Sequence, residues 1–134
     1  MSAHRTCLLV LVAWTGCSTD GRSPYFQATS KSVRSDLIKL VPPGSLFARG
    51  FRDIEVEGFT CEEIRPLEPG PRGFEESSPR TGAPAGALCR LVNPRGCLGT
   101  QVVEVWILVD SEPTTGGEYR VVDLAVQNYT DEIP

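Results

Sequence analysis

Two alternating apolar runs near the C-terminus most constrain the fold of this chain. Apolar side chains occupy every second position within residues 101–110 and again within residues 119–127. This period of two predicts strands that bury one face. The proline and the glycine pair of residues 112–117 are typical of a turn. The two runs therefore predict an antiparallel hairpin.

Two helices are expected ahead of this hairpin. Residues 32–41 carry apolar side chains at helical spacing, with Ser32 as the N-cap, and the Pro-Pro-Gly of residues 42–44 ends the segment. A second helix is expected to follow Ser45 as its N-cap. It should end at Gly58, a position where glycine adopts a left-handed conformation.

Two more strands, over residues 59–64 and 87–92, complete the predicted sheet. Between them, residues 65–86 hold five prolines and four glycines, a composition that favours a mobile loop. The sequence therefore predicts an α+β fold, with two N-terminal helices packed on a four-stranded antiparallel sheet. We expect residues 31–130 to form this single domain, since a chain of 134 residues leaves room for little else.

The N-terminus has the order of charge and apolar residues of a secretory signal peptide. Residues 1–5 carry positive charge, and an apolar run of eight residues follows over residues 7–14. This run is too short for a membrane-spanning helix, which needs roughly 20 residues. We therefore expect residues 1–16 to be removed.

Residues 14–17, Trp-Thr-Gly-Cys, resemble the bacterial lipobox, in which small residues precede a cysteine that is lipidated and becomes the new N-terminus. Trp14 stands where that family usually has leucine. The resemblance implies that acylated Cys17 anchors the protein in a lipid bilayer. Ser18 resembles the residue of lipoproteins sent to the outer membrane, facing the periplasm. Residues 17–30 would then be a flexible tether, and conventional secretion without a lipid remains the alternative.

Three cysteines remain once Cys7 leaves with the signal peptide and Cys17 is acylated. An exported compartment permits disulfides, and three thiols allow three single pairings. We favour Cys61–Cys89, because both lie in predicted strands and would clamp the bases of the Pro-rich loop, which leaves Cys97 as a free thiol. A metal site is disfavoured, because the thiols lack a CxxC pair and a fourth ligand.

Charge and histidine content narrow the classes of function. The 13 basic and 17 acidic residues give a net charge of −4 with no basic cluster, which argues against a nucleic-acid partner. The single histidine, His4, lies in the segment that we expect to be removed, so the mature chain would lack the commonest general base. Neither common glycine-rich phosphate motif occurs, and we expect no cofactor.

Acidic residues are the remaining candidates for catalysis. A hydrolase that acts through carboxylates alone would need Glu62, Glu63, Glu104 or Asp123 to converge in one pocket. Neighbouring residues of a strand point to opposite faces, however, so solvated charge is the favoured interpretation of the Glu62–Glu63 pair. We therefore expect no catalytic residues.

Trp106 and the segment Asn128-Tyr-Thr130 are two further candidates. Trp106 lies opposite the apolar face of its predicted strand, where it is either an exposed binding residue or, as we favour, packed under the helices or the Pro-rich loop. Residues 128–130 fit the acceptor pattern for N-glycosylation, which would matter only in a eukaryotic protein.

The expected order of elements resembles the small envelope lipoproteins of the BamE-like (SmpA/OmlA) and β-lactamase-inhibitor-like groups. The resemblance is carried by Leu-Val-Pro-Pro-Gly-Ser at residues 40–45, followed by a helix, and by Gly-Phe-Thr-Cys at residues 58–61. It covers residues 32–129 in element order only. It implies two helices on an antiparallel sheet but carries no partner over to this chain.

Two functions follow from these features. The first is a non-enzymatic envelope lipoprotein that binds another envelope protein or supports an assembly, with a free sheet edge able to take an added strand. The second is a conventionally secreted inhibitor or small-ligand-binding protein that uses residues 65–86 for recognition.

Overall fold

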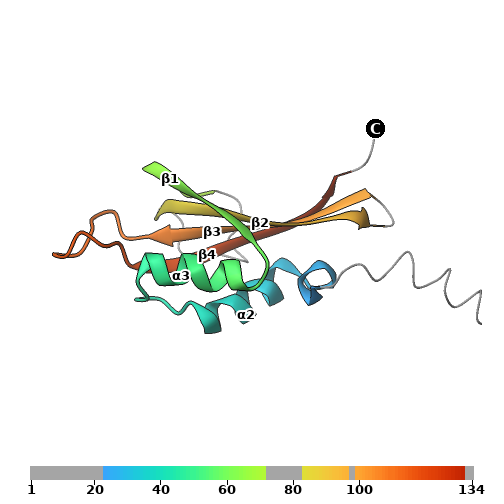
Figure 1. Ribbon diagram of the computed structural model, residues 1–134, viewed down its shortest axis with the longest axis horizontal. Coiled ribbons are helices and arrows are strands. Elements are labelled where there is room, and N and C mark those ends of the chain that lie inside the picture. Colours follow the sequence, from blue (N-terminus) through green and yellow to red (C-terminus); the bar gives the residue numbers. More distant parts are fainter. Residues whose placement is uncertain (1–22, 72–82, 97–98, 132–134) are drawn as a thin grey trace, which may run out of the picture.

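The computed structural model describes residues 23–71, 83–96 and 99–131 of the chain. In chain order, its elements are η1 (Pro24–Gln27), α2 (Ser30–Leu40), α3 (Phe47–Val56), β1 (Thr60–Pro69), β2 (Pro84–Gly96), β3 (Gly99–Val109) and β4 (Val121–Asp131). The four strands form one antiparallel sheet in the order β1-β2-β3-β4 (Figure 1). The predicted α+β class, with two α-helices and four antiparallel strands, is therefore confirmed.

The register of the sheet explains the alternating sequence pattern. Cys89, Val105 and Val126 occupy one row across β2, β3 and β4. Because side chains alternate between the faces of a strand, such rows gather the apolar residues of several strands on one face. The predicted hairpin of residues 101–110 and 119–127 is β3–β4, although β4 starts at Val121 and continues to Asp131.

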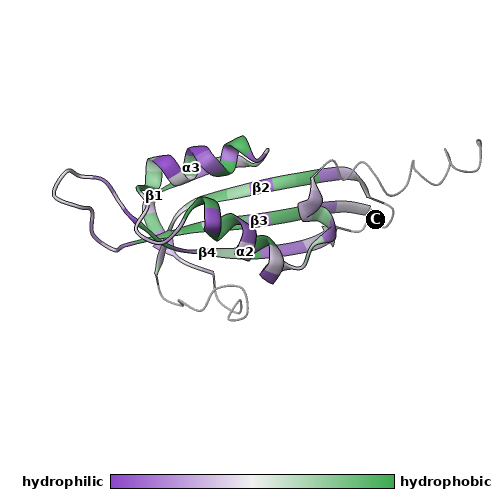
Figure 2. Ribbon diagram, turned by 90° about the horizontal axis from the view of Figure 1, so that it is seen from below, coloured by the Kyte–Doolittle hydropathy of each residue, from purple (hydrophilic) through white to green (hydrophobic). Residues whose placement is uncertain are grey.

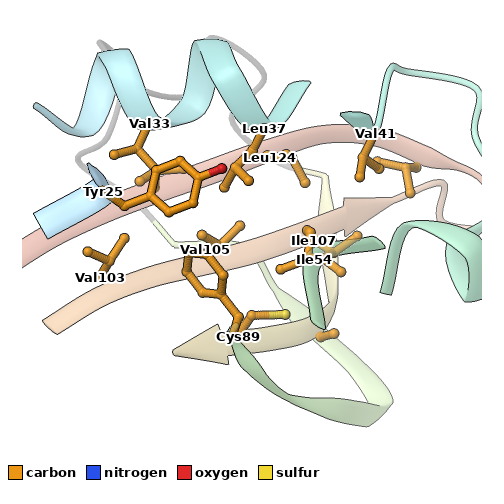
Figure 3. Close-up of a cluster of buried hydrophobic side chains, with 14 of the residues drawn as sticks. Tyr25, Val33, Leu37, Val41, Ile54, Cys89, Val103, Val105, Ile107 and Leu124 are labelled. Carbon is orange, nitrogen blue, oxygen red and sulfur yellow. The ribbon is translucent and has the colours of Figure 1, made fainter. Parts of the chain in front are cut away.

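One buried apolar cluster contains side chains of both helices and of the sheet. Val33 and Leu37 of α2 and Ile54 of α3 belong to the same cluster as Ile107 and Leu124 of the sheet (Figure 3). Both helices lie on the same side of the sheet in Figure 1. Figure 2 shows apolar and polar stripes along them and mostly apolar central strands. Burial is worth about 25 cal/mol per Å² of apolar surface, so this cluster is the main source of stability.

The folded part begins before residue 31, the predicted boundary. Tyr25 of η1 is 8% exposed, and its ring lies 5.8 Å from the ring of Phe59. Its hydroxyl donates a hydrogen bond to Glu57 Oε1 at 2.9 Å. Residues 23–30 therefore belong to the domain, and the expectation that they form part of a tether is wrong. A buried aromatic ring with a bonded hydroxyl outweighs the polar composition of the surrounding segment.

Both α-helices start in a way that differs from the prediction. Thr29 caps α2, and its Oγ1 accepts a hydrogen bond from the Ser32 N–H at 3.1 Å. Before α3, the Ser45 hydroxyl donates to Pro42 O at 2.6 Å, and α3 has no side-chain cap. The Ser45 carbonyl accepts from the Val121 N–H at 2.8 Å. Ser45 therefore connects the helix to the start of β4 instead of capping it.

The predicted loop of residues 65–86 is shorter than expected at both ends. β1 continues to Pro69 and β2 starts at Pro84, so only the segment between these residues leaves the sheet. β1 is an edge strand, where prolines are tolerated because no second neighbour requires their N–H groups. The predicted mobility concerns mainly residues 72–82, which lie outside the described residues.

The predicted Cys61–Cys89 disulfide is present and joins directly opposed residues of β1 and β2. It closes a segment with a sequence separation of 28 residues. By loop entropy alone, closing about 28 residues stabilises the folded chain by roughly 3.6 kcal/mol. The other two cysteines with predicted roles, Cys17 and Cys97, lie outside the described residues.

Candidate binding groove

A groove of about 400 Å³ opens at one end of the domain, between the start of α3 and the middle of β1. We call it the α3–β1 groove. Its walls come from α3, β1 and the loop between β3 and β4, and its floor comes from β2 and β3. The residues that line it are Phe47, Ala48, Glu63, Ile64, Arg65, Pro66, Leu67, Gly86, Val109, Gly117, Glu118 and Tyr119.

An irregularity in the β1–β2 ladder forms the β1 wall. Glu63 faces Ala87 and Glu68 faces Ala85, so β1 uses three more residues than β2 to cover the same distance. Extra residues leave the ladder and bend the strand that carries them. Leu67 packs from this bend against the main apolar cluster. The wall therefore joins Glu63 and Ile64, which were expected in a strand, to residues 65–67, which were expected in a loop.

The opposite wall is fixed by backbone hydrogen bonds between α3 and the β3–β4 loop. The Phe47 N–H donates to Tyr119 O at 2.9 Å, and the Gly44 N–H donates to Val121 O at 2.7 Å. These bonds tie the first turn of α3 to the segment that leads into β4. Because both partners are backbone groups, the side chains of Phe47 and Tyr119 remain available to line the groove.

Gly86 allows the floor of the groove to lie close to α3. A Cβ atom at this position would lie 3.1 Å from Phe47 Cε2 and 3.2 Å from Val109 Cγ1. Such distances are tighter than ordinary van der Waals contact, so a larger residue would displace the Phe47 ring. Phe47 also packs edge-on against Phe51, with ring centroids 5.9 Å apart. The apolar surface of the groove is thus held by packing on two sides.

Charged residues are confined to the rim of the groove. Arg65 Nε lies 2.8 Å from Glu63 Oε2, and both side chains are solvent-accessible. Glu118 is exposed on the opposite side. An apolar floor with a few polar groups at the mouth is typical of sites that bind a small molecule or an apolar side chain. Within the described ranges, no group of three or more histidine, cysteine or acidic residues could hold a metal ion.

The structure does not bring the four candidate carboxylates together. Glu63 pairs with Arg65 at the groove, whereas Glu104 pairs with Arg90 and Asp123 pairs with Arg34. Glu62 is exposed on β1 and, with Glu104, contributes to the raised pKa of Arg90, which is caused mainly by its hydrogen bond to Glu104. The arrangement that carboxylate-based hydrolysis would need is therefore not formed by these residues.

Trp106 is half-buried on the face of the sheet opposite the helices. It packs against a small cluster that contains Ala85, Leu108 and Ala125. Trp106 is therefore packed and not fully exposed, but it does not lie under the helices, and that part of the expectation is wrong.

Asn128 is engaged in the fold through both ends of its amide group. Its Nδ2 donates to Ala28 O at 2.6 Å, and its Oδ1 accepts a hydrogen bond from the Ser30 hydroxyl. The nitrogen that a glycan would modify is therefore occupied in the folded domain.

The two edges of the sheet differ in accessibility. Along β4, Arg34 Nε donates to Leu124 O at 3.1 Å and the Asn128 N–H donates to Ser30 Oγ at 3.2 Å, so α2 covers this edge. β1 forms the other edge and is mostly exposed, but it carries Pro66, Pro69 and several charges. Such residues hinder the addition of a further strand. The free edge expected from the sequence is therefore restricted to the start of β1.

Comparisons with known proteins found no matching family model, no similar curated protein and no similar solved structure. The helices of the described residues are all too short or too polar to cross a membrane. The sequence pattern did not indicate the groove as a site. The weak signals for it were Gly86 between two alanines and the apolar Leu67 next to Pro66.

Proposed function

We propose that this protein is a non-enzymatic lipoprotein of the bacterial envelope that binds a partner protein through the α3–β1 groove. Acylated Cys17 would anchor it in the outer membrane, facing the periplasm. The groove is the observation that carries the proposal: it combines apolar surface from Phe47, Leu67 and Tyr119 with an ion pair at its rim. An apolar side chain of a partner would fill the groove while the partner's polar groups meet the rim.

A second candidate is a conventionally secreted small-ligand-binding protein or inhibitor. The size of the groove favours it, since about 400 Å³ falls within the usual range for small-molecule sites. Residues 65–67 and Gly86 belong to the stretch assigned to recognition in this alternative. Both candidates use the same groove, and they differ in the occupant and in the lipid anchor.

The anchor is tested by membrane fractionation and mass measurement of the wild type and Cys17→Ser. We expect the wild type in the membrane fraction, with a mass that includes acyl chains beginning at Cys17, and Cys17→Ser in the soluble fraction. Equal solubility of the two proteins would remove the lipoprotein proposal and favour conventional secretion.

The occupant is tested by placing a photo-crosslinking amino acid at Ala48, which is exposed at the mouth of the groove. Ser35 on α2 is an exposed control position that does not line the groove. In native cells we expect one discrete protein adduct from position 48 and none from position 35. A small-molecule adduct at position 48 would favour the second candidate. The same protein adducts from both positions would contradict a role of the groove.

A further inference from the structure

The segment before α2 is fixed to the domain at several points. Tyr25 is buried and hydrogen-bonded to Glu57, and Phe26 packs against the main apolar cluster. Ala28 O accepts a hydrogen bond from Asn128 Nδ2 at 2.6 Å. The chain is therefore held to the domain from about Ser23 onward, and only the residues before Ser23 can serve as a tether.

This attachment makes the connection to Cys17 short. Ser23 lies six residues after Cys17, and each residue spans at most about 3.5 Å, so the connection reaches at most about 21 Å. β3, with 11 residues, is about 35 Å long. The tether is therefore shorter than the sheet.

The attachment point and the groove lie at opposite ends of the sheet. Phe26 of η1 lies beside Gln101 and Val102 at the start of β3, whereas Val109 at the end of β3 lines the groove. Figure 1 shows η1 at one end of the long axis and the β3–β4 loop at the other. The eight residue steps from Gln101 to Val109 span about 27 Å, so with the η1 end held within about 21 Å of the bilayer the domain cannot stand upright with its groove end on the membrane.

We propose that the η1 end of the domain rests on the lipid surface and that the α3–β1 groove faces away from it, toward the aqueous periplasm. This inference rests on the proposed acylation of Cys17. It deepens the proposed function, because the partner of the groove would have to approach from the aqueous side and not from within the bilayer.

The test uses the acylated protein in vesicles of phosphatidylethanolamine and phosphatidylglycerol that contain brominated lipids, which quench tryptophan at short range. In a Trp106→Phe background, the introduced residue is the only tryptophan once Trp14 leaves with the signal peptide. One variant carries Gln27→Trp and the other carries Thr115→Trp, both at exposed positions. We expect strong loss of fluorescence for Gln27→Trp and little loss for Thr115→Trp.

Two controls separate the possible failures. A flexible Gly/Ser insertion of roughly 20 residues after Gly21, which can extend to about 70 Å, should reduce the difference between the two variants. Equal or stronger quenching of Thr115→Trp without the insertion would overturn the orientation. If the protein with this quenching result is acylated, only the orientation is refuted and the lipid anchor stands. If mass measurement shows that the protein carries no acyl chains, the anchor and the orientation are both refuted. Circular dichroism verifies that each variant is folded.

Discussion

The absence of one methyl group sets the distance between α3 and the sheet. Gly50 is buried, and a Cβ atom at this position would lie 2.7 Å from Val41 Cγ1 and 3.3 Å from Val121 Cγ2. Val41 and Val121 are both fully buried, so neither side chain can move aside freely. Glycine costs helix stability relative to alanine, and this close contact explains why it is nevertheless present.

Gly50→Ala is therefore expected to destabilise the domain, although alanine is the better helix former. Overpacking costs about 1–3 kcal/mol, and the gain in helix propensity returns at most about 1 kcal/mol. Urea denaturation measures the difference. The matched control is Gly116→Ala, where the nearest atom to the added Cβ is Thr114 Oγ1 at 3.9 Å. A Gly50→Ala protein as stable as the wild type would contradict the close packing.

Tyr25 is the second residue whose environment makes a measurable prediction. Burial, followed by the hydrogen bond to Glu57 and its negative charge, raises the pKa of Tyr25 from 10.0 to about 12. The folded protein therefore favours the protonated hydroxyl more strongly than the unfolded chain does. The stabilisation from this group is complete below pH 10 and is lost as the pH rises toward 12.

We expect Tyr25→Phe to lower the free energy of unfolding by about 0.5–1.5 kcal/mol at pH 8, the usual value of one hydrogen bond. The deficit should shrink between pH 10 and pH 12, because the wild-type hydroxyl ionises in that range. Absorbance titration of the wild type minus Tyr25→Phe isolates Tyr25 from Tyr119 and Tyr129. A midpoint near 10 in that difference curve would contradict the buried, hydrogen-bonded hydroxyl.

At the scale of elements, local sequence patterns correctly predicted the features that depend on neighbouring residues alone, such as the strands β3 and β4 and the end of α3. The alternation in β3 and β4 was sufficient, because a strand buried on one face must alternate. Gly58 was predicted to end α3 and adopts φ +102°. Ser45 failed as an N-cap because its backbone pairs with Val121, 76 residues away in the chain, a contact that no local pattern contains. The prediction that this strand ends at residue 64 was wrong for a similar reason. β1 is an edge strand, which tolerates Pro66, and its position at the edge is not visible in the local sequence.

Arg34 is one of the α2 residues that bond to the β4 edge, another being Ser30. Arg34 pairs with Asp123 and also donates to Leu124 O, while its side chain is 23% exposed and that of Asp123 is 3% exposed. Removing one partner of a buried pair leaves an uncompensated charge. From the sequence alone Asp123 was only a candidate catalytic group, because its partner Arg34 lies 89 residues away in the chain.

Arg34→Ala is expected to destabilise the domain by about 2–4 kcal/mol in urea denaturation. The double variant Arg34→Met/Asp123→Asn should recover part of this loss, because it removes the charge and retains an acceptor for the Leu124 N–H. Arg49→Ala is the control: that side chain is 82% exposed and 4.0 Å from Asp53, and its loss should cost less than about 1 kcal/mol. Equal effects of Arg34→Ala and Arg49→Ala would refute the structural role of the buried pair.

At the scale of the whole molecule, the groove could not be predicted because it has no sequence signature of its own. Its lining residues come from α3, β1, β2, β3 and the β3–β4 loop, and only the sheet register brings them together. The candidate carboxylates were chosen for their chemistry, and the fold distributes them among different arginines. Fold class follows from periodicity, whereas a site formed by five segments follows from the assembled structure.

The proposed orientation depends on where the folded domain begins, because this residue sets the length of the tether. If the domain began at residue 31, the tether could span 13 residues after Cys17 and the orientation would be loose. If it begins at Ser23, η1 is part of the core. Two truncations decide between these boundaries: one chain starting at Ser23 and one starting at Ser30.

The chain starting at Ser23 should be as stable as the full exported protein, because it retains Tyr25, Phe26 and the Thr29 cap. The chain starting at Ser30 loses all three. Removing a buried aromatic side chain costs about 3–5 kcal/mol and removing an N-cap costs about 1 kcal/mol, so a loss of at least about 3 kcal/mol is expected in urea denaturation. Equal stability of the two truncations would mean that η1 contributes nothing to the core. The tether would then be as long as its polar composition suggests, and the end of the domain nearest the membrane would no longer be fixed.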